Sequence, residues 1–261
     1  MKKILSLLFI AVMLFTGNIS AHAVANEYNW YFKSAENHNQ PIVFDNIKFP
    51  DKYGAIYMGS PDEKVIYLTF DAGYISDNVI KILDILKEQQ VKSAFFILPV
   101  VVEKNTDIAK RMYQEGHIVA NHSYSHKNMA RITDRDTFLN ELTRLEDLYF
   151  QHTGYKMSKY FRPPEGIFSE QNLAFCHEAG YIPTFWSFAY ADWDNNNQKS
   201  AVWARKKVLD CVHNGMVMLL HPNSETNATI LGDVISELKN DGYRFGTLDE
   251  LVLYRDSKKS G

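Results

Sequence analysis

The sequence predicts an α/β fold in which parallel strands are joined by helical crossovers. From Lys64 onward, short apolar runs rich in β-branched and aromatic residues alternate with amphipathic segments, and the alternation repeats about seven times. Most amphipathic segments end on a glycine, which supplies the left-handed cap that closes a helix. Strands that alternate with helices form either a barrel or a doubly wound sheet. The residues alone leave these two architectures open.

The runs expected to form strands are short and apolar. In chain order they are VIYLTF (65–70), SAFFILP (93–99), HIVANH (117–122), KYF before Arg162, TFWSF (184–188), MVMLLH (216–221) and a short YRFGTL near the C-terminus. None of them leads into a GxGxxG fingerprint or a P-loop lysine. The sequence therefore gives no support to a Rossmann or P-loop nucleotide site.

The segments between these runs place apolar side chains on one helical face. After the first strand, the residues expected to share that face are Val79, Ile80, Leu83 and Leu86. A long helix is expected near 134–152, followed by Gly154, with Phe138, Leu142, Leu145 and Tyr149 in register. Further helices are expected to end at Gly116, Gly180, Gly215 and about Asn240.

Residues 1–25 have the composition of a secretory signal peptide. Two lysines precede an apolar run from Ile4 to Phe15, and small residues follow it. The run is shorter than the roughly 20 residues that span a bilayer, so a permanent membrane anchor is disfavoured. We expect cleavage after Ala23 or Ala25 and a protein that is secreted or held in the cell envelope.

The remaining residues suit one large domain preceded by an arm. Residues 26–61 are rich in Asn, Tyr, Trp and Pro without clear periodicity, which predicts an extended N-terminal arm packed on the barrel. The chain is 46% hydrophobic and 23% charged with a net charge of -3, so it lacks the basic footprint of a nucleic-acid-binding protein. We expect no nucleic-acid partner, no stable membrane span and a monomer. Cys176 and Cys211 are the only cysteines, and pairing or two free thiols are both open.

Polar side chains gather where the expected strands end. Asp71, His122, Arg162, Asp192 and His221 each follow an apolar run. In a parallel α/β barrel the carboxyl ends of the strands converge on one face, where active sites are built. One such residue alone would more often cap a helix or satisfy the core. Five at one face predict a catalytic centre.

Two motifs add detail to this centre. The spacing of His122 and His126 in NHSYSH would put both imidazoles on one face of a helical turn, as metal ligands require. Two ligands make a weak site, and Ala72 stands where a second carboxylate would have followed Asp71. In FRPPEG two prolines fix the backbone after Arg162, which beside Asp71 would keep that carboxylate ionised and aimed. An ordinary turn with a surface arginine is the alternative.

With TFDAG, HSYSH, FRPPEG, ADW and LLH in this order, the chain resembles the polysaccharide deacetylases, carbohydrate esterase family four, also called the NodB homology domain. The resemblance covers about residues 62–252, which places a catalytic domain at 62–255. It implies a distorted (β/α)7 barrel and metal-assisted hydrolysis of an N-acetyl group. The arm sequence NWYFKSAENHNQP, the substituted TFDAG, FRPPEGIFSE and AYADWDNNNQK are similar to the subgroup that deacetylates N-acetylmuramic acid in peptidoglycan and forms muramic δ-lactam in spore cortex.

The resemblance also implies catalytic roles. Asp71 resembles the general base that takes a proton from water, with Arg162 as its orienting partner. His221 resembles the general acid that protonates the leaving amine, and Asp192 would hold it in its useful tautomer. Amide hydrolysis needs an activated water, a stabilised oxyanion and a proton for the departing nitrogen, so these roles are chemically consistent.

Substrate and metal contacts are implied in the same way. Trp193 and Leu219 would line the acetyl pocket, Glu165 would offer its backbone N–H to the oxyanion, and Tyr74 would contact the sugar. His122 and His126 match the two histidine ligands of a divalent metal, for which we expect Zn²⁺. Ala72 replaces the family's usual aspartate ligand, so we expect weak binding completed by water or substrate.

We therefore expect an exported enzyme that acts on peptidoglycan glycan strands, removes the acetyl group of peptide-free N-acetylmuramic acid and leads to muramic δ-lactam. One alternative is a deacetylase of N-acetylglucosamine polymers or an acetylxylan esterase, because sugar choice lies in loops that the sequence does not resolve. Another is a catalytically inactive glycan-binding protein in which Ala72 marks decay. The presence of Asp71, Arg162, Asp192 and His221 argues against that second alternative.

Overall fold

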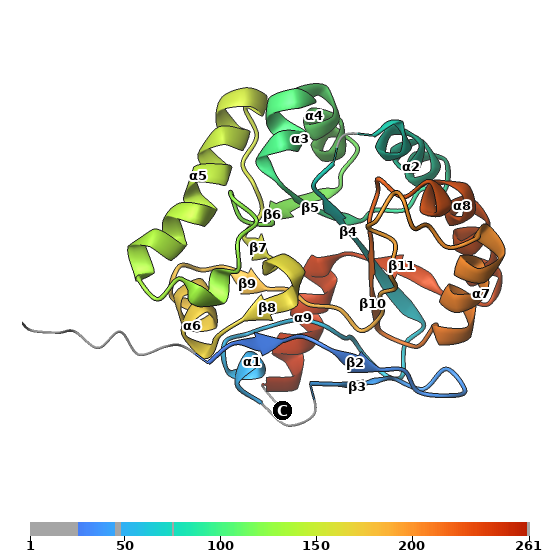
Figure 1. The fold of residues 1–261 in the computed structure, drawn as a ribbon. Helices are drawn as coiled ribbons and strands as arrows, with labels where there is room; N and C mark the ends of the chain where they lie inside the picture. Colours follow the sequence, from blue (N-terminus) through green and yellow to red (C-terminus); the bar gives the residue numbers. More distant parts are fainter. Residues whose placement is uncertain (1–25, 45–47, 75, 260–261) are drawn as a thin grey trace, which may run out of the picture.

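The computed structural model of the protein describes residues 26–44, 48–74 and 76–259, so the expected signal peptide lies outside the described residues. A seven-stranded parallel sheet forms the centre and curls within a layer of helices (Figure 1). The strand order is β10-β4-β5-β6-β7-β9, and β11 also pairs with β4. The fold is the distorted barrel that the sequence resemblance implied, and the doubly wound alternative is excluded.

The strands of this sheet are β4 (Val65–Ala72), β5 (Ala94–Ile97), β6 (Ile118–Asn121), β7 (Tyr160–Phe161), β9 (Ile182–Pro183), β10 (Met216–Leu220) and β11 (Arg244–Gly246). The helices around it are α2 (Asp77–Glu88), α3 (Pro99–Lys104), α4 (Thr106–Gln114), α5 (Arg135–Thr153), α6 (Glu170–Glu178), α7 (Ala201–Cys211), α8 (Glu225–Asn240) and α9 (Leu248–Lys259). Among the described residues, no helix has the length and hydropathy needed to cross a membrane.

One strand was placed wrongly from the sequence. TFWSF (184–188) was expected to be a strand, but β9 ends at Pro183 and the next residues make only isolated bridges. The cause is the N-terminal arm, whose Ile56 donates its N–H to Pro183 and accepts one from Phe185. Phe188 then bridges to Met218 of β10, so this segment closes the barrel without forming a full strand.

The helix predictions were mostly confirmed. Helix α5 begins after Asp134, whose side chain accepts from the Thr137 N–H, and ends at Gly154 with φ 79. In α2 the expectation for Ile80 was wrong, because its side chain is 41% exposed while Ile82 is fully buried. The buried face follows the i, i+3, i+4, i+7 spacing that starts at Val79. Helix α9 was not expected from the sequence.

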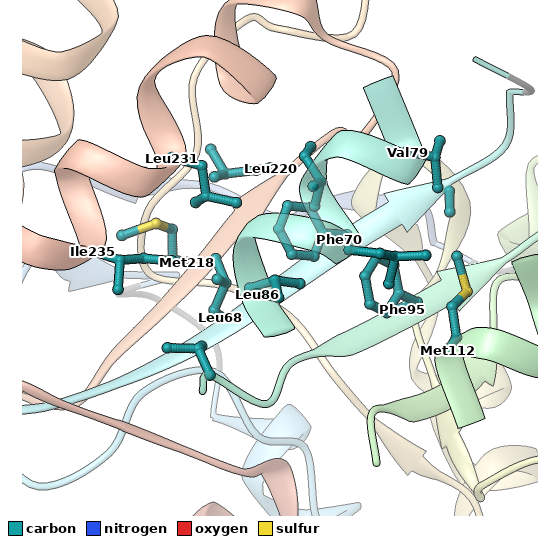
Figure 2. Close-up of a cluster of buried hydrophobic side chains, with 14 of the residues drawn as sticks. Leu68, Phe70, Val79, Leu86, Phe95, Met112, Met218, Leu220, Leu231 and Ile235 are labelled. Carbon is teal, nitrogen blue, oxygen red and sulfur yellow. The ribbon is translucent and has the colours of Figure 1, made fainter. Parts of the chain in front are cut away.

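The largest core lies between the sheet and the outer helices. Alternate residues of β4 point to this side, and Leu68 and Phe70 pack there with Leu86 of α2 and Leu231 of α8 (Figure 2). Full burial of each such side chain contributes about 1.5–3 kcal/mol relative to exposure. Because side chains alternate along a strand, Thr69 and Asp71 of β4 face the other way, into the barrel.

The described part of the arm, residues 26–44 and 48–61, runs along the lower side of the barrel in Figure 1 as β1 (Tyr28–Asn29), β2 (Phe32–Lys33), β3 (Ile42–Val43) and α1 (Phe49–Lys52). Strand β1 pairs antiparallel with β8 (Ile167–Phe168). Trp30 stacks on Phe185 with ring centroids 4.2 Å apart, and its indole N–H donates to the Trp186 carbonyl. Glu27 accepts from Asn128 and Arg131, in the segment that follows β6. The arm thus contacts two segments that follow strands of the barrel.

Candidate active site

A buried ion pair lies at the end of β4. The Arg162 Nη1 donates to Oδ1 of Asp71 at 2.7 Å, and the arginine side chain is fully buried. Burial raises the pKa of Asp71, but the charge and hydrogen bond of Arg162, together with the charges of His122 and His221, outweigh burial, so the pKa of Asp71 lies below its ordinary value. Asp71 is therefore a carboxylate at neutral pH.

The rest of the guanidinium is also bonded. Nη2 of Arg162 donates to Thr69 Oγ1 at 2.9 Å and Nε donates to the Thr184 carbonyl at 3.2 Å. The guanidinium carbon lies 4.1 Å from the centroid of the Phe96 ring. Sequence reasoning missed Thr69, although its spacing two residues before Asp71 puts both side chains on one face of β4. The expected surface-arginine alternative is excluded, because Arg162 is a fixed interior group.

His221 follows β10 and forms a second acid-base pair. Its Nδ1–H donates to Oδ1 of Asp192 at 2.7 Å, and its backbone N–H donates to Oδ2 at 2.8 Å. Burial of the imidazole lowers its pKa, but the hydrogen bond and charge of Asp192, with the charge of Asp71, outweigh burial and raise the pKa of His221. With Nδ1 engaged, Nε2 is the ring atom left to exchange a proton.

The two histidines of NHSYSH lie together, but not on a helical turn. Residues 122–126 form an irregular loop in which Ser123 and His126 have positive φ, so the expected helical spacing was wrong. Asn121 Oδ1 accepts from the Ser123 N–H, and Ser123 Oγ accepts from the His126 N–H. These local side-chain bonds favour a turn over a helix. The loop still brings the rings of His122 and His126 to 5.1 Å between centroids.

The state of His122 suits a metal ligand. Its Nδ1–H donates to the Arg162 carbonyl at 2.9 Å, which leaves the Nε2 lone pair free, 3.6 Å from Oδ2 of Asp71. Burial lowers the pKa of His122 to about 4, so the ring is neutral at pH 7. A ligating histidine commonly donates its second N–H to a carbonyl in this way.

The donor set fits a metal only in part. Within residues 26–44, 48–74 and 76–259 no group of three or more His, Cys, Asp or Glu side chains is arranged to hold an ion. The side chain of Ala72 does not face the site, because it packs on the helix side of β4 with the outer core. Two imidazoles would need water or substrate oxygens to complete the tetrahedral shell that Zn²⁺ prefers.

The expected substrate-binding residues fall into different surroundings. Leu219 pairs in register with Thr69, so it is on the barrel side beneath Asp71. Trp193 is 56% exposed and its ring meets the His221 ring edge-on at 6.2 Å. Glu165 is exposed and has a left-handed backbone, with φ 57 and ψ 8. Tyr74 lines a small apolar pocket with Ala72 on the other side of β4.

Two further side chains hold the histidine loop and were missed by sequence reasoning. Glu141 of α5 accepts from both the N–H and the hydroxyl of Ser125 at 2.8 Å. The Arg144 guanidinium lies over the Tyr124 ring at 3.7 Å. Both come from α5, where they directly precede Leu142 and Leu145 of the buried face that the sequence did reveal. Polar residues beside such a face carry no periodic signal that would have singled them out.

Two other residue types behave as simple structural groups. His117 is buried and its Nδ1 accepts from the Ser93 N–H at 3.2 Å, as expected for a histidine that is not a ligand. Cys176 and Cys211 are both free thiols, so the pairing alternative is not realised. Neither group belongs to the site.

Comparison with known proteins identifies the family to which this chain belongs. Residues 58–184 match the family model of the polysaccharide deacetylases. Over 260 residues the chain is 38% identical to the peptidoglycan-N-acetylmuramic acid deacetylase PdaA of Bacillus subtilis, covering 99% of this chain and 98% of that protein. The chain belongs to the polysaccharide deacetylase family.

Two further comparisons agree with this placement. The polysaccharide deacetylase described here superimposes on the solved structure of Bacillus subtilis PdaA, a family 4 carbohydrate esterase, with a TM-score of 0.82 and 39% identity, covering 87% of this chain and 97% of that one. It is also 34% identical to a peptidoglycan-N-acetylglucosamine deacetylase of Bacillus cereus over 80% of this chain and 76% of that protein. This polysaccharide deacetylase is therefore a hydrolase that cleaves the amide bond of N-acetyl groups.

Proposed function

We propose that this polysaccharide deacetylase removes the acetyl group from peptide-free N-acetylmuramic acid residues of peptidoglycan glycan strands. The observation that carries the proposal is the presence of two opposed acid-base pairs in one site, Asp71 with Arg162 and His221 with Asp192. The 38% identity to PdaA along nearly the whole chain supports muramic acid as the substrate.

The first step uses Asp71. Its Oδ1 is held by Arg162, so Oδ2 is the oxygen that accepts a proton from the attacking water. The water oxygen bonds to the acetyl carbonyl carbon, whose oxygen becomes an oxyanion. The backbone N–H of Glu165, in its left-handed conformation, is our candidate donor to that oxyanion. One such donor contributes about 2.7–4 kcal/mol of transition-state stabilisation.

The second step uses His221. Protonated and paired with Asp192, the imidazole donates the Nε2 proton to the departing nitrogen as the C–N bond breaks. Acetate and the free amine of the sugar result. Leu219 and Trp193 are our candidates for the walls that hold the acetyl methyl group. The roles of base and acid need separated proton affinities, which the two different partners supply.

His122 and His126 are the residues that would hold a divalent metal, with Zn²⁺ as the proposed ion. A bound ion would polarise the carbonyl and lower the pKa of its water. With two protein ligands we propose a weak, readily exchanged site. Metal binding is measurable without activity, by equilibrium dialysis of Zn²⁺ against the unmodified protein and His126→Ala.

Export, the spore cortex and the δ-lactam complete the proposal. A muramic amine freed beside a lactyl carboxyl can close to the δ-lactam once the stem peptide is absent. Residues 1–25 are proposed to direct export. Recovery of open muramic acid without lactam would remove cyclisation from the proposal and leave deacetylation intact.

The decisive experiment uses the full-length protein on amidase-treated glycan strands and on chitin oligomers, with and without Zn²⁺, followed by mass spectrometry of the released saccharides. We expect acetyl loss confined to muramic residues and abolished in Asp71→Asn. Asp249→Asn, which changes a carboxylate bonded to Tyr160 elsewhere in the barrel, is the matched control. Loss from glucosamine residues alone, or strand binding without any loss, would overturn the proposal.

A further inference from the structure

A buried asparagine joins the His221–Asp192 pair to the start of α8. Asn227 is fully buried and lies in the first turn of the helix, where its backbone N–H donates to the N-cap hydroxyl of Ser224 at 3.1 Å. Its Nδ2 donates to Oδ2 of Asp192 at 2.6 Å and to the His221 carbonyl at 3.1 Å. One amide group thus touches both members of the pair.

The orientation of this amide is fixed by chemistry. The hydroxyl of Tyr190 donates to Oδ1 of Asn227, and burial raises the pKa of Tyr190, so the phenol keeps its proton. A flipped amide would set Oδ1 against the Asp192 carboxylate and the His221 carbonyl, which are both acceptors. Only one amide orientation satisfies all three neighbours.

The Asp192 carboxylate is held at both oxygens. Oδ2 accepts from the backbone N–H of His221 and from Asn227, while Oδ1 accepts from the ring Nδ1–H of His221. The two oxygens move together, so any rotation of the carboxylate that displaced Oδ1 from the ring would also break the bonds at Oδ2. The bonds at Oδ2 therefore determine where Oδ1 lies.

We propose that Asn227 is a positioning residue for His221, holding Asp192 in the orientation that keeps the imidazole in its Nδ1–H tautomer and aims Nε2 into the site. This inference rests on the proposed role of His221 as the general acid. Tyr190 is the second member of the device, because it orients the asparagine.

The expected effect of losing Asn227 has a defined direction. The charged groups that act on His221 are Asp192, Asp71 and Arg162. Asp192 and Asp71 favour the protonated ring, whereas burial and Arg162 oppose it. If Asp192 is no longer held against Nδ1, burial is less fully offset and the pKa of His221 falls.

The chain offers a matched control in α6. Asn172 is also buried and also lies three residues after an N-cap serine, Ser169. Its backbone N–H donates to the Ser169 hydroxyl at the same distance of 3.1 Å. Its Nδ2 donates to the Ile132 carbonyl at 3.0 Å, away from the acid-base pairs. Asn172→Leu therefore removes a comparable buried amide without touching His221.

The test is an NMR titration of the His221 ring in the full-length protein, in Asn227→Leu, in Tyr190→Phe and in Asn172→Leu. We expect the pH midpoint of the His221 titration to fall in Asn227→Leu and to fall less in Tyr190→Phe. In Asn172→Leu the midpoint should equal that of the unmodified protein. Tyr190→Phe keeps the aromatic ring and so gives an answer even if Asn227→Leu does not fold. An unchanged or raised midpoint in the folded site variants, or an equal fall in Asn172→Leu, would overturn the proposal.

Activity provides the second readout. On the glycan substrate we expect kcat of Asn227→Leu to fall by about tenfold to a hundredfold, by analogy with the loss seen when a hydrogen-bond partner of a metal-binding histidine is removed, with KM nearly unchanged. Equal losses of kcat in Asn227→Leu and Asn172→Leu would show a purely structural role. If the unmodified protein releases no acetate, the proposed function fails, whereas the titration still decides whether Asn227 positions His221.

Discussion

Arg162 and Asp71, which are 91 residues apart in the chain, form an ion pair of 2.7 Å that is closed to solvent on the arginine side. A buried pair of this kind persists only where the remaining donors are also bonded. Thr69 and the Thr184 carbonyl meet that need for Arg162. The pair therefore stabilises the fold and also holds the carboxylate that we propose as the base, and its removal should have two separable effects.

Arg162→Met should lower the free energy of unfolding by about 3–5 kcal/mol, because it leaves a buried charge without a partner. The pKa of Asp71 should rise, since the charge that lowers it is gone. Asp71, the proposed base, would then be protonated up to a higher pH, so the acidic limb of the pH profile of kcat/KM should shift to higher pH. Urea unfolding and a pH profile measure the two effects.

The control for this change is Arg205→Met, which breaks an exposed pair with Glu237 and should cost less than about 1 kcal/mol. An unaltered acidic limb in a folded Arg162→Met variant would show that Asp71 is not the group seen in the pH profile.

His117 should make the protein less stable in acid. Burial lowers its pKa to about 4 from an ordinary 6.5, so the unfolded chain takes up the proton first. The contribution of His117 to the free energy of unfolding is therefore full above pH 6.5 and is lost as the pH falls toward 4. The loss between pH 7 and pH 4.5 should be about 2 kcal/mol. In His117→Gln, whose amide oxygen can accept from Ser93, this acid-dependent loss should shrink by that amount in denaturant titrations.

Exposed His152 at the end of α5 gives the comparison for that measurement. His152→Gln should leave the difference between pH 7 and pH 4.5 as it is in the unmodified protein. Equal behaviour of the two variants would mean that another group controls acid stability.

Ala72→Asp should not rebuild a three-ligand metal site. The side chain of residue 72 packs with Val79 and Val101 on the helix side of β4, so a carboxylate there enters apolar surroundings. The free energy of unfolding should fall by at least about 2 kcal/mol, with no gain in Zn²⁺ affinity. Ala72→Val separates size from charge. Tighter Zn²⁺ binding at unchanged stability would show that the strand end turns residue 72 into the site.

Glu165→Gln should favour anionic substrates. Its exposed carboxylate belongs to the residue whose backbone N–H is proposed for the oxyanion, so it would repel the lactyl carboxylate of a bound peptide-free muramic acid. Removing the charge should lower KM for that substrate by about twofold to fivefold, as for an exposed charge pair. KM for neutral glucosamine oligomers should not change. Salt should diminish the difference, and equal KM changes for both substrates would contradict the electrostatic explanation.

The sequence predicted what depends on periodicity and local caps. Helix α5 was placed within two residues because its apolar spacing, the Asp134 cap and Gly154 agree. Ile80 was misassigned because neighbouring apolar residues blur the edge of a helical face. TFWSF was misassigned because its partner is Ile56 of the arm, and long-range pairing leaves no mark on local composition.

The site shows the same division. Strand ends indicated Asp71, Arg162 and His221 because parallel strands deliver their carboxyl ends to one edge. The helical turn predicted for His122 and His126 does not form, because the side chains of Asn121 and Ser123 accept hydrogen bonds from backbone N–H groups of the loop. Asn227 was missed because an asparagine in a first helical turn usually reports only a cap, and its contact with Asp192 spans 35 residues.

The arm imposes an order on folding. The indole N–H of Trp30 donates to the carbonyl of Trp186, which comes 156 positions later in the chain, and β1 pairs with β8. The segment that the ribosome makes early is therefore among those placed late, after more than half of the chain exists. Until then Trp30 and Phe44 lack their aromatic partners Phe168 and Phe185, and contacts so distant in sequence slow folding. A chain truncated before Trp186 should aggregate, and mutations that hasten arm docking should raise the yield of refolding.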